Sequence, residues 1–333
     1  MHVLVLGGTR FIGPFVVREL DRLGHEVTVF HRGEHEPGLP RTIRHVHGDF
    51  ASFDARVEDL RGLRPHVVLD MRALTRADAT RVGAFAAVAN RAVVASSCDV
   101  YRAYGRLWRT EPGPPDPVPL TEDAPLRSQV IDEGYDKVGV EEQLGQLDIP
   151  TTVLRLPAVH GPGDYQHRLW SYVKRMDDGR PAILLDELVA GWRWTRGYVE
   201  DVAHAIVLAV IDPGAAGRTF NVGAAPVATE AEWVAAIAGA VGWQGEVVRA
   251  KSSVLPEYLR EDDFDLRQQY VADSSRIRRE LGYAEIVDPH EALLRTVEWE
   301  RANPPGPDHP HLTRVDRFDC ATEDAALEGV GRA

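Results

Sequence analysis

Three glycines in the first thirteen residues have the spacing of a phosphate-binding turn. The apolar run Val3–Leu6 precedes them and an apolar-periodic segment follows, so the chain is expected to pass from a strand through the turn into a helix. Such a turn aims backbone N–H groups and the positive end of a helix dipole at one point, which suits a pyrophosphate. This context predicts a dinucleotide-binding turn. The residues expected to hold the cofactor there are Gly7, Gly8, Thr9, Arg10, Phe11, Ile12 and Gly13.

The residues after the second expected strand bear on which dinucleotide binds. A site for NAD usually carries Asp or Glu there, which accepts hydrogen bonds from the adenosine ribose. This chain has His31 and Arg32 instead, and Arg10 occupies a position of the turn where glycine is common. Two guanidiniums match a 2′-phosphate with forks of donors. We therefore expect NADP, with NAD as the alternative.

Composition and charge narrow the function classes. The 333 residues are 44% hydrophobic and 27% charged, with a net charge of −13. This charge argues against nucleic acid as the main partner, which requires a basic face. No apolar stretch approaches the ~20 residues that span a bilayer, and no signal-peptide pattern is seen at Met1. Two cysteines are too few for a disulfide framework, so a reducing cytoplasm is expected.

The first half of the chain alternates strand and helix signals, which predicts an α/β fold with a doubly wound parallel sheet of Rossmann type. A smaller carboxyl-terminal lid is expected to cover the substrate. The nucleotide-binding domain is predicted over 1–156, with about 196–222 returning to it, and the lid over about 157–195 and 223–300. The strands are expected at Val3–Leu6, Val27–Phe30, Ile43–His47, Val67–Leu69, Ala92–Ser96 and Thr152–Leu156. Later helices are expected at Val202–Val210, Glu230–Ala240 and Arg276–Leu281.

Two Pro-rich stretches interrupt this alternation. Arg109–Pro125 is acidic as well as Pro-rich and is expected to be a surface loop. Ala302–His311 opens a tail, 301–333, whose periodicity is weak. We expect that tail to be a loose arm or an oligomer contact.

Several motifs occur together in one order over about residues 1 to 300. The sequence thereby resembles the extended or atypical short-chain dehydrogenase/reductase family of the NAD(P)-dependent epimerase/dehydratase type. The resemblance implies cofactor contacts from Asp49, Phe50, Lys137 and Pro157, and a homodimer packed through long helices. The motifs are Gly7–Gly13, Gly48-Asp49, Ser96–Tyr101, Thr121–Leu126, Arg155–Gly163, Arg196–Ala203, Asn221–Gly223, Asp273–Arg276 and Leu281–Tyr283.

The catalytic helix departs from the family pattern Tyr-x-x-x-Lys-x-x-x-Glu. Lys137 and Glu141 keep their spacing, but Glu133 stands at the tyrosine position and the tyrosine is Tyr135. Residues two apart on a helix point roughly 200° apart, so Tyr135 reaches the family site only through an irregular first turn, which Gly134 permits. Glu133 with a raised pKa is the second candidate for acid/base chemistry. A group on another element, such as Asp99 or Tyr101, is the third.

The resemblance also implies roles for other side chains. Ser97 would hydrogen-bond the substrate oxygen, and Lys137 would bind the nicotinamide ribose and lower the pKa of a tyrosine. In the lid, alternation places Trp192 and Trp194 on one face, and the family supplies an arginine from this region, here Arg196. Substrate contacts are therefore expected from Tyr101, Trp194 and Arg196.

Histidines near the second and third expected strands are candidate metal ligands. His45 and His47 share a strand face, with His31 and His35 nearby in sequence. No carboxylate or thiol is spaced to complete a site, so solvated histidines and no metal are expected.

The function predicted from these observations is hydride exchange between NADP(H) and a small carbonyl or hydroxyl substrate, a sugar derivative or natural-product intermediate. The enzyme would be an oxidoreductase or epimerase. A protein that keeps the cofactor site but lacks a proton donor would instead be a non-catalytic NADP(H) sensor. Similarity to plant chloroplast stem-loop-binding proteins raises RNA binding as a third hypothesis, which the net charge of −13 opposes.

Overall fold

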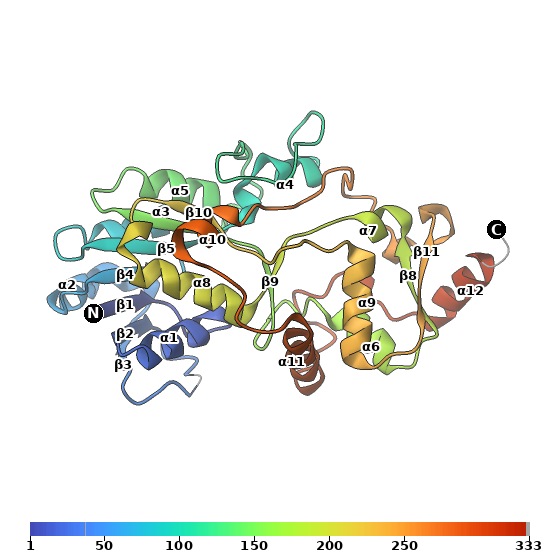
Figure 1. Ribbon diagram of the computed structural model, residues 1–333, viewed down its shortest axis with the longest axis horizontal. Coiled ribbons are helices and arrows are strands. Elements are labelled where there is room, and N and C mark those ends of the chain that lie inside the picture. Colours follow the sequence, from blue (N-terminus) through green and yellow to red (C-terminus); the bar gives the residue numbers. More distant parts are fainter. Residues whose placement is uncertain (37, 331–333) are drawn as a thin grey trace.

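A seven-stranded parallel sheet forms the larger part of the molecule in the computed structural model, which describes residues 1–36 and 38–330 (Figure 1). The strand order is β10-β6-β5-β4-β1-β2-β3, so the order reverses between β4 and β1. The predicted α/β fold class is confirmed, as are the six strands predicted for this sheet. Its strands are β1 (His2–Leu6), β2 (Glu26–His31), β3 (Arg44–His47), β4 (Val67–Asp70), β5 (Arg91–Ser97), β6 (Thr151–Leu156) and β10 (Thr219–Asn221).

Both faces of this sheet are covered, which explains why its strands are apolar on both sides. Val3 and Val5 pack into one core with helices α1 (Ile12–Arg22) and α8 (Val199–Ile211). Leu4 and Leu6 point the other way, into a second core. Successive side chains of a strand point to opposite faces of the sheet, so alternate residues of β1 enter different hydrophobic cores. The second layer is closed by α2 (Val57–Gly62), α3 (Arg76–Gly83) and α5 (Lys137–Leu144).

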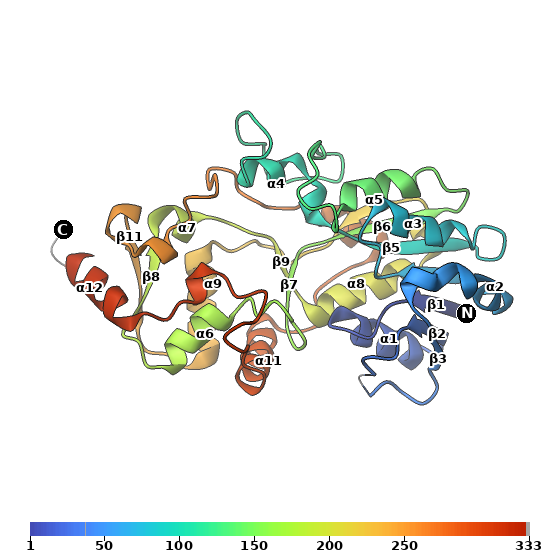
Figure 2. The ribbon, with the colours of Figure 1, turned by 180° about the vertical axis from the view of Figure 1, so that it is seen from behind.

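The lid lies at the opposite end of the molecule from β2 and β3 (Figure 2). It contains the parallel strand pair β8 (Ala182–Asp186) and β11 (Glu246–Ala250), and its core is separate from those of the sheet. A second short pair, β7 (Ala158–His160) with β9 (Arg196–Tyr198), connects lid and sheet. The lid helices are α6 (Trp170–Asp177), α7 (Glu187–Gly191), α9 (Glu230–Val241) and α11 (Pro289–Ala302).

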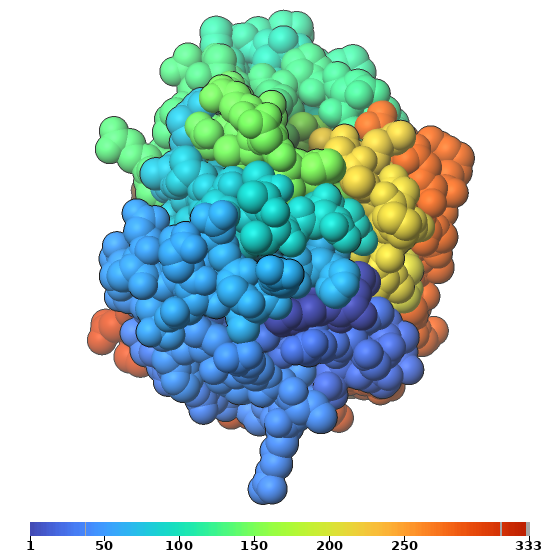
Figure 3. Space-filling model, turned by 90° about the vertical axis from the view of Figure 1, so that its left-hand side faces the viewer, coloured from blue at the N-terminus to red at the C-terminus, as the bar shows by residue number. Residues whose placement is uncertain are grey.

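One helix predicted for the lid belongs to the sheet side. Helix α10 (Ser275–Leu281) contacts β10 and α8, and its Ile277 is fully buried in the core that α1 and α8 share. Figure 3 shows the molecule from the left-hand side of Figure 1. In this view the orange surface of this part of the chain borders the yellow surface of the part that holds α8 and β10. The apolar side chains of α10 need a partner, and they find it on the sheet side.

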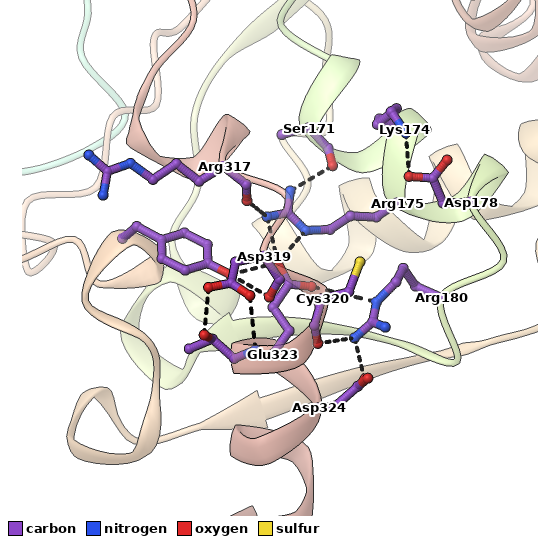
Figure 4. A network of polar contacts seen from close by, with 12 residues as sticks. Ser171, Lys174, Arg175, Asp178, Arg180, Arg317, Asp319, Cys320, Glu323 and Asp324 are labelled. Atoms are coloured by element: carbon purple, nitrogen blue, oxygen red, sulfur yellow. Dashed lines mark hydrogen bonds and ion pairs between the residues drawn. The ribbon is translucent and has the colours of Figure 1, made fainter.

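The carboxyl-terminal tail does not form the loose arm predicted for it. Helix α12 (Cys320–Val330) packs on the lid, where Glu323 is only 3% exposed (Figure 4). The Arg175 guanidinium donates two hydrogen bonds to the Glu323 carboxylate, at 3.0 and 2.8 Å, and Tyr258 donates a third at 3.1 Å. A buried carboxylate needs such partners. They come from distant parts of the chain, so the tail's own periodicity gave no sign of them.

The helices are short. The longest one among the described residues, α11, has 14 residues, and α4 (Arg102–Leu107), which follows β5, has six. In the part of the chain that the structure describes, none of the helices combines the length and apolar character that crossing a bilayer requires.

The buried carboxyl of Asp70, at the end of β4, makes stability depend on pH. Burial raises its pKa from 3.8 to about 6, although the Arg72 amide donates to Oδ1 at 2.7 Å. The folded chain therefore holds a proton that the unfolded chain releases between about pH 4 and pH 6, so stability falls as pH rises through this window. Oδ2 has no hydrogen-bond partner among the described residues.

We predict that Asp70→Asn stabilises the protein more at neutral than at acidic pH. Relative to the wild type, its free energy of unfolding should grow by on the order of 1 kcal/mol between about pH 5 and pH 7.5, because the amide carries no charge. Urea unfolding at the two pH values measures this difference. The exposed Asp59→Asn is the control and should show no such change. A difference independent of pH would contradict the account.

Candidate active site

The glycine-rich turn between β1 and α1 is tightly folded. Gly7 and Gly8 have φ values of 90° and 84°, a region that favours glycine. A Cβ on Gly13 would lie 2.4 Å from the Cα of Gly8, so the start of the helix packs directly on the turn. Arg10 keeps an ordinary φ, and Phe11 takes the left-handed value of 47° in its place. A side chain at Gly13 would thus collide with the backbone of Gly8, and this close packing of helix on turn is a feature of dinucleotide-binding turns.

Two guanidiniums and a carboxylate meet beside this turn, after β2. The Glu34 carboxylate lies 2.8 Å from the Arg32 guanidinium and 3.7 Å from that of Arg10. All three side chains are exposed, so the pairs are held weakly. The loop therefore presents two cations for a ribose phosphate and one acid that competes for them. His31, also predicted to contact the cofactor, is 3% exposed and its ring faces His45.

Two further residues predicted from the family lie after β3, at the same edge of the sheet. The Asp49 carboxylate accepts the Ala51 amide at 2.9 Å and begins the short helix η1 (Phe50–Ala55). Phe50 is 8% exposed, and the guanidinium of Arg72 lies 5.2 Å from its ring centroid. These positions flank the crevice at the carboxyl ends of the strands, where ligands bind in open α/β sheets.

Helix α5 begins later than the family pattern implies. It starts at Lys137, where the Asp136 carboxylate caps it by accepting the Gly139 amide at 3.1 Å. The preceding residues form a turn in which the Tyr135 amide donates to the Asp132 carbonyl at 3.0 Å. The helical separation between positions 135 and 137 therefore does not apply. The irregular first turn on which the Tyr135 hypothesis depended is present in the structure.

This turn carries Tyr135 to the serine that ends β5. The Ser97 hydroxyl and the Asp99 carboxylate lie near enough to its phenol to influence the pKa of that phenol, and the Lys137 Nζ lies 5.4 Å from its ring centroid. Burial, and then the charge of Asp99, raise the pKa of the Tyr135 phenol, which stays protonated at neutral pH. Serine, tyrosine and lysine thus lie together, although the tyrosine comes from a position two residues from the lysine.

The Lys137 ammonium is buried within the crevice wall. Its Nζ donates to the carbonyl oxygens of Ala73 at 2.6 Å and Ala95 at 3.0 Å. Burial lowers the pKa of Lys137, while Asp99 and Asp70 oppose this shift. Lys137 therefore ties the start of α5 to the ends of β4 and β5.

Two predicted candidates occupy environments unlike the ones expected. Glu133 is exposed in the turn before α5. Tyr101 is fully buried, and its hydroxyl donates to Asn221 at 2.5 Å and accepts from Arg155 at 3.0 Å. The substrate contact predicted for Tyr101 does not fit this environment, because its hydroxyl is occupied within the core. Pro157 lies at the entry to the lid and packs closely on Gly197. A Cβ added to Gly197 would lie 3.0 Å from the Pro157 ring.

A cavity of about 910 Å³ lies between the lid and the sheet domain. Trp192 and Trp194 both line it, with ring centroids 5.6 Å apart, as the expected alternation implied. Tyr104 lines the cavity too, and burial, followed by the charge of the nearby Asp99, raises the pKa of its phenol to about 12. Tyr104 is therefore a lining residue that lies near Asp99.

Arg196 lines the cavity but is already held by protein groups. It is ion-paired with Glu230, and its guanidinium lies 4.7 Å from the Trp233 ring centroid and 5.7 Å from that of Trp194. The Tyr172 hydroxyl donates to the same carboxylate at 2.9 Å. Sequence reasoning identified Arg196 and Trp194 and missed Glu230 and Trp233. Both lie on α9. Apolar residues are spread around this helix, so its sequence does not indicate which face would meet a ligand.

Comparison with known proteins agrees with this geometry. Residues 3–223 match the sequence pattern of the NAD dependent epimerase/dehydratase family, so the chain belongs to that family. The family is enzymatic, and the resemblance inferred from the motifs is confirmed.

The individual proteins that this chain is similar to have names that describe different activities. The 2′-dehydrokanamycin reductase of Streptomyces kanamyceticus is 29% identical over an alignment of 268 residues, and the match covers 71% of this chain and 71% of the reductase. A chloroplast stem-loop binding protein of 41 kDa from Arabidopsis thaliana is 24% identical over 87% of this chain and 77% of its own. The enzyme WbmG from Bordetella bronchiseptica, solved with NAD and UDP, has a TM-score of 0.67 and 18% identity, covering 90% of this chain and 94% of WbmG. This last likeness shows the fold.

Proposed function

We propose that the protein is an NADP(H)-dependent reductase that converts a ring ketone of a small, amine-bearing, polyhydroxylated molecule into an alcohol. The observation that carries the proposal is the position of Tyr135 in the turn before α5, near Ser97 and with the Lys137 Nζ 5.4 Å from its ring centroid. Tyr135 would then be the proton donor that the sequence left unassigned. The similarity to a 2′-dehydrokanamycin reductase supports the same reaction class.

The residues around the crevice fit the cofactor. The tight turn at Gly8 and Gly13, at the start of α1, would hold a pyrophosphate, and Arg10 and Arg32 would hold the 2′-phosphate of NADP. Lys137 would hold the ribose next to the nicotinamide, exchanging a carbonyl partner for the sugar hydroxyls. When bound, the reduced cofactor supplies the hydride that reaches the carbonyl carbon.

Ser97 and Tyr135 would act on the carbonyl oxygen. The Ser97 hydroxyl would donate a hydrogen bond that orients the ketone, and the Tyr135 phenol would give its proton to the oxygen as the alcohol forms. Because the Tyr135 phenol is protonated at neutral pH, it suits a donor in the reductive direction. The adjacent Lys137 cation would stabilise the phenolate left behind, and solvent would then reprotonate it.

The lining of the cavity favours a cationic substrate. It contains four carboxylates and two guanidiniums. Arg196 is ion-paired with one of the four carboxylates, Glu230, and Arg168 with Asp164, which lies outside the lining. Four tryptophans complete the lining, and indole faces attract ammonium groups. A diphosphate would have to displace Glu230 from Arg196. Protonated amines on a sugar-like ring match these walls better.

We predict a selective effect of Arg32 on cofactor choice. Arg32→Ala should weaken NADPH binding by about 10-fold with little change for NADH, because a charge-assisted hydrogen bond to the 2′-phosphate is lost. Glu34→Gln should strengthen NADPH binding, since it frees both arginines. Calorimetry on both cofactors measures this, with the distant surface variant Arg22→Ala as control. Equal affinities in the wild type would contradict the assignment.

We predict that Tyr135→Phe lowers kcat by about 10²–10⁴-fold while NADPH affinity stays unchanged, because proton donation is lost and the ring contact with Lys137 remains. Glu133→Gln, the competing candidate two residues away, should stay within about twofold of the wild type. Oxidation of NADPH by ketone substrate measures both variants. A large loss in Glu133→Gln with an active Tyr135→Phe would reverse the assignment.

We predict a charge requirement on the substrate side. With NADPH, 2′-dehydrokanamycin is the first ketone to test, and acetylating its amines should lower kcat/KM at least about 10-fold, because the ammonium groups lose the carboxylates and indole faces of the cavity. UDP-sugars should give no turnover. Turnover of UDP-sugars, or equal rates with free and acetylated amines, would rule out the proposed amine-bearing substrate class. Neither result would contradict the proposed reductase activity.

A further inference from the structure

Three imidazoles and one carboxylate meet at the edge of the sheet, on β2, β3 and the loop between them. His31 ends β2, and His45 and His47 lie on β3, where the register pairs His31 with His47. Glu36 comes from the connecting loop. One ligand atom from each of the four residues lies within 4.8 Å of the others. The sequence showed no carboxylate spaced to complete a site with these histidines. In the structure the loop brings one to them, that of Glu36.

The four side chains are already in close contact. His31 Nε2 lies 2.8 Å from His45 Nδ1, and His47 Nε2 lies 2.8 Å from the Glu36 Oε1. The ring centroid of His31 is 5.0 Å from that of His45 and 4.8 Å from that of His47. Three imidazoles and one carboxylate therefore converge on one point, and both kinds of group are ligands that Zn²⁺ takes.

We propose that His31, His45, His47 and Glu36 form a binding site for a divalent transition-metal ion, with Zn²⁺ as the ion that fits best. Zn²⁺ takes four ligands in tetrahedral geometry, with bonds of about 2.0–2.2 Å to nitrogen and oxygen, so its donors lie about 3.3 Å apart. The two 2.8 Å pairs need to open by only about half an ångström to reach this spacing. Imidazole donors favour Zn²⁺, Cu²⁺ and Ni²⁺ over Mg²⁺ and Ca²⁺.

Metal binding requires two exchanges of hydrogen bonds. At His47 the ring proton on Nε2, which the Glu36 carboxylate accepts, must move to Nδ1 so that Nε2 can bind the ion. The second exchange is at His31. The Gly33 amide donates to His31 Nδ1 at 3.1 Å, so the ring proton sits on Nε2 and faces His45. A metal ion that takes the Nε2 lone pair moves this proton to Nδ1, and the Gly33 amide must turn away. Gly33 has φ 81°, and glycine rearranges at low cost. The change alters the backbone next to Arg32 and Glu34, so metal binding reshapes the loop beside the cofactor crevice.

The test uses the full-length protein, stripped with a chelator and titrated with Zn²⁺ against a chromophoric competitor. One equivalent should bind. His47→Ala should weaken binding by more than about 100-fold, beyond the 10–100-fold typical of residues that only orient a ligand. Glu36→Gln should weaken it less. His47 and Glu36 are 55% and 53% exposed, so both variants should keep the fold, which thermal unfolding in chelator checks.

The matched control is His35→Ala, an exposed histidine of the same loop that lies outside the cluster. It should bind Zn²⁺ like the wild type. Co²⁺ provides a second readout, because tetrahedral Co²⁺ gives intense visible absorption that octahedral Co²⁺ lacks. Equal affinity in His47→Ala and His35→Ala, no stoichiometric binding, or an octahedral Co²⁺ spectrum would each overturn the site. None of these results depends on NADPH binding or turnover.

Discussion

The buried ammonium of Lys137 organises the crevice. Its hydrogen bonds to the carbonyls of Ala73 and Ala95 join the start of α5 to the ends of β4 and β5. A buried cation must be compensated, so these contacts fix where the helix begins and therefore where the preceding turn lies. That turn carries Tyr135 to Ser97. The family pattern has a tyrosine on this helix, whereas Tyr135 lies before the helix, with the Lys137 Nζ 5.4 Å from its ring centroid.

A second group of paired charges shapes the lid. Glu230 is ion-paired with Arg196, whose guanidinium lies near the indole rings of Trp233 and Trp194. This pair occupies an arginine that lines the cavity. In the tail, Glu323 pairs with Arg175, and residues around Pro310 line the cavity. The carboxyl-terminal segment is thus part of the cavity wall.

The strands and most helices were predictable from the sequence because their signal is local. Val3–Leu6 reads as a doubly buried strand, and the glycines that follow require a turn whatever surrounds them. The start of α5 was not predictable in this way. The spacing of Lys137 and Glu141 suggests a longer helix, and only the contacts of Lys137 with the Ala73 carbonyl after β4 and the Ala95 carbonyl in β5 show why the helix begins where it does. Helix α10 and the tail failed to match prediction for a related reason, since the partners of Ile277 and Glu323 lie far away in the chain.

The sequence by itself determined the sheet, the phosphate-binding turn and the set of polar residues available to the crevice, because periodicity and glycine spacing act over a few neighbouring residues. The tertiary structure alone decided which of those residues meet. It placed Tyr135 with Ser97 and left Glu133 at the surface, buried Tyr101 against Asn221, and brought Glu36 to three histidines. The physical reason is that such meetings depend on strand order and loop paths, which distant contacts fix and local sequence does not encode.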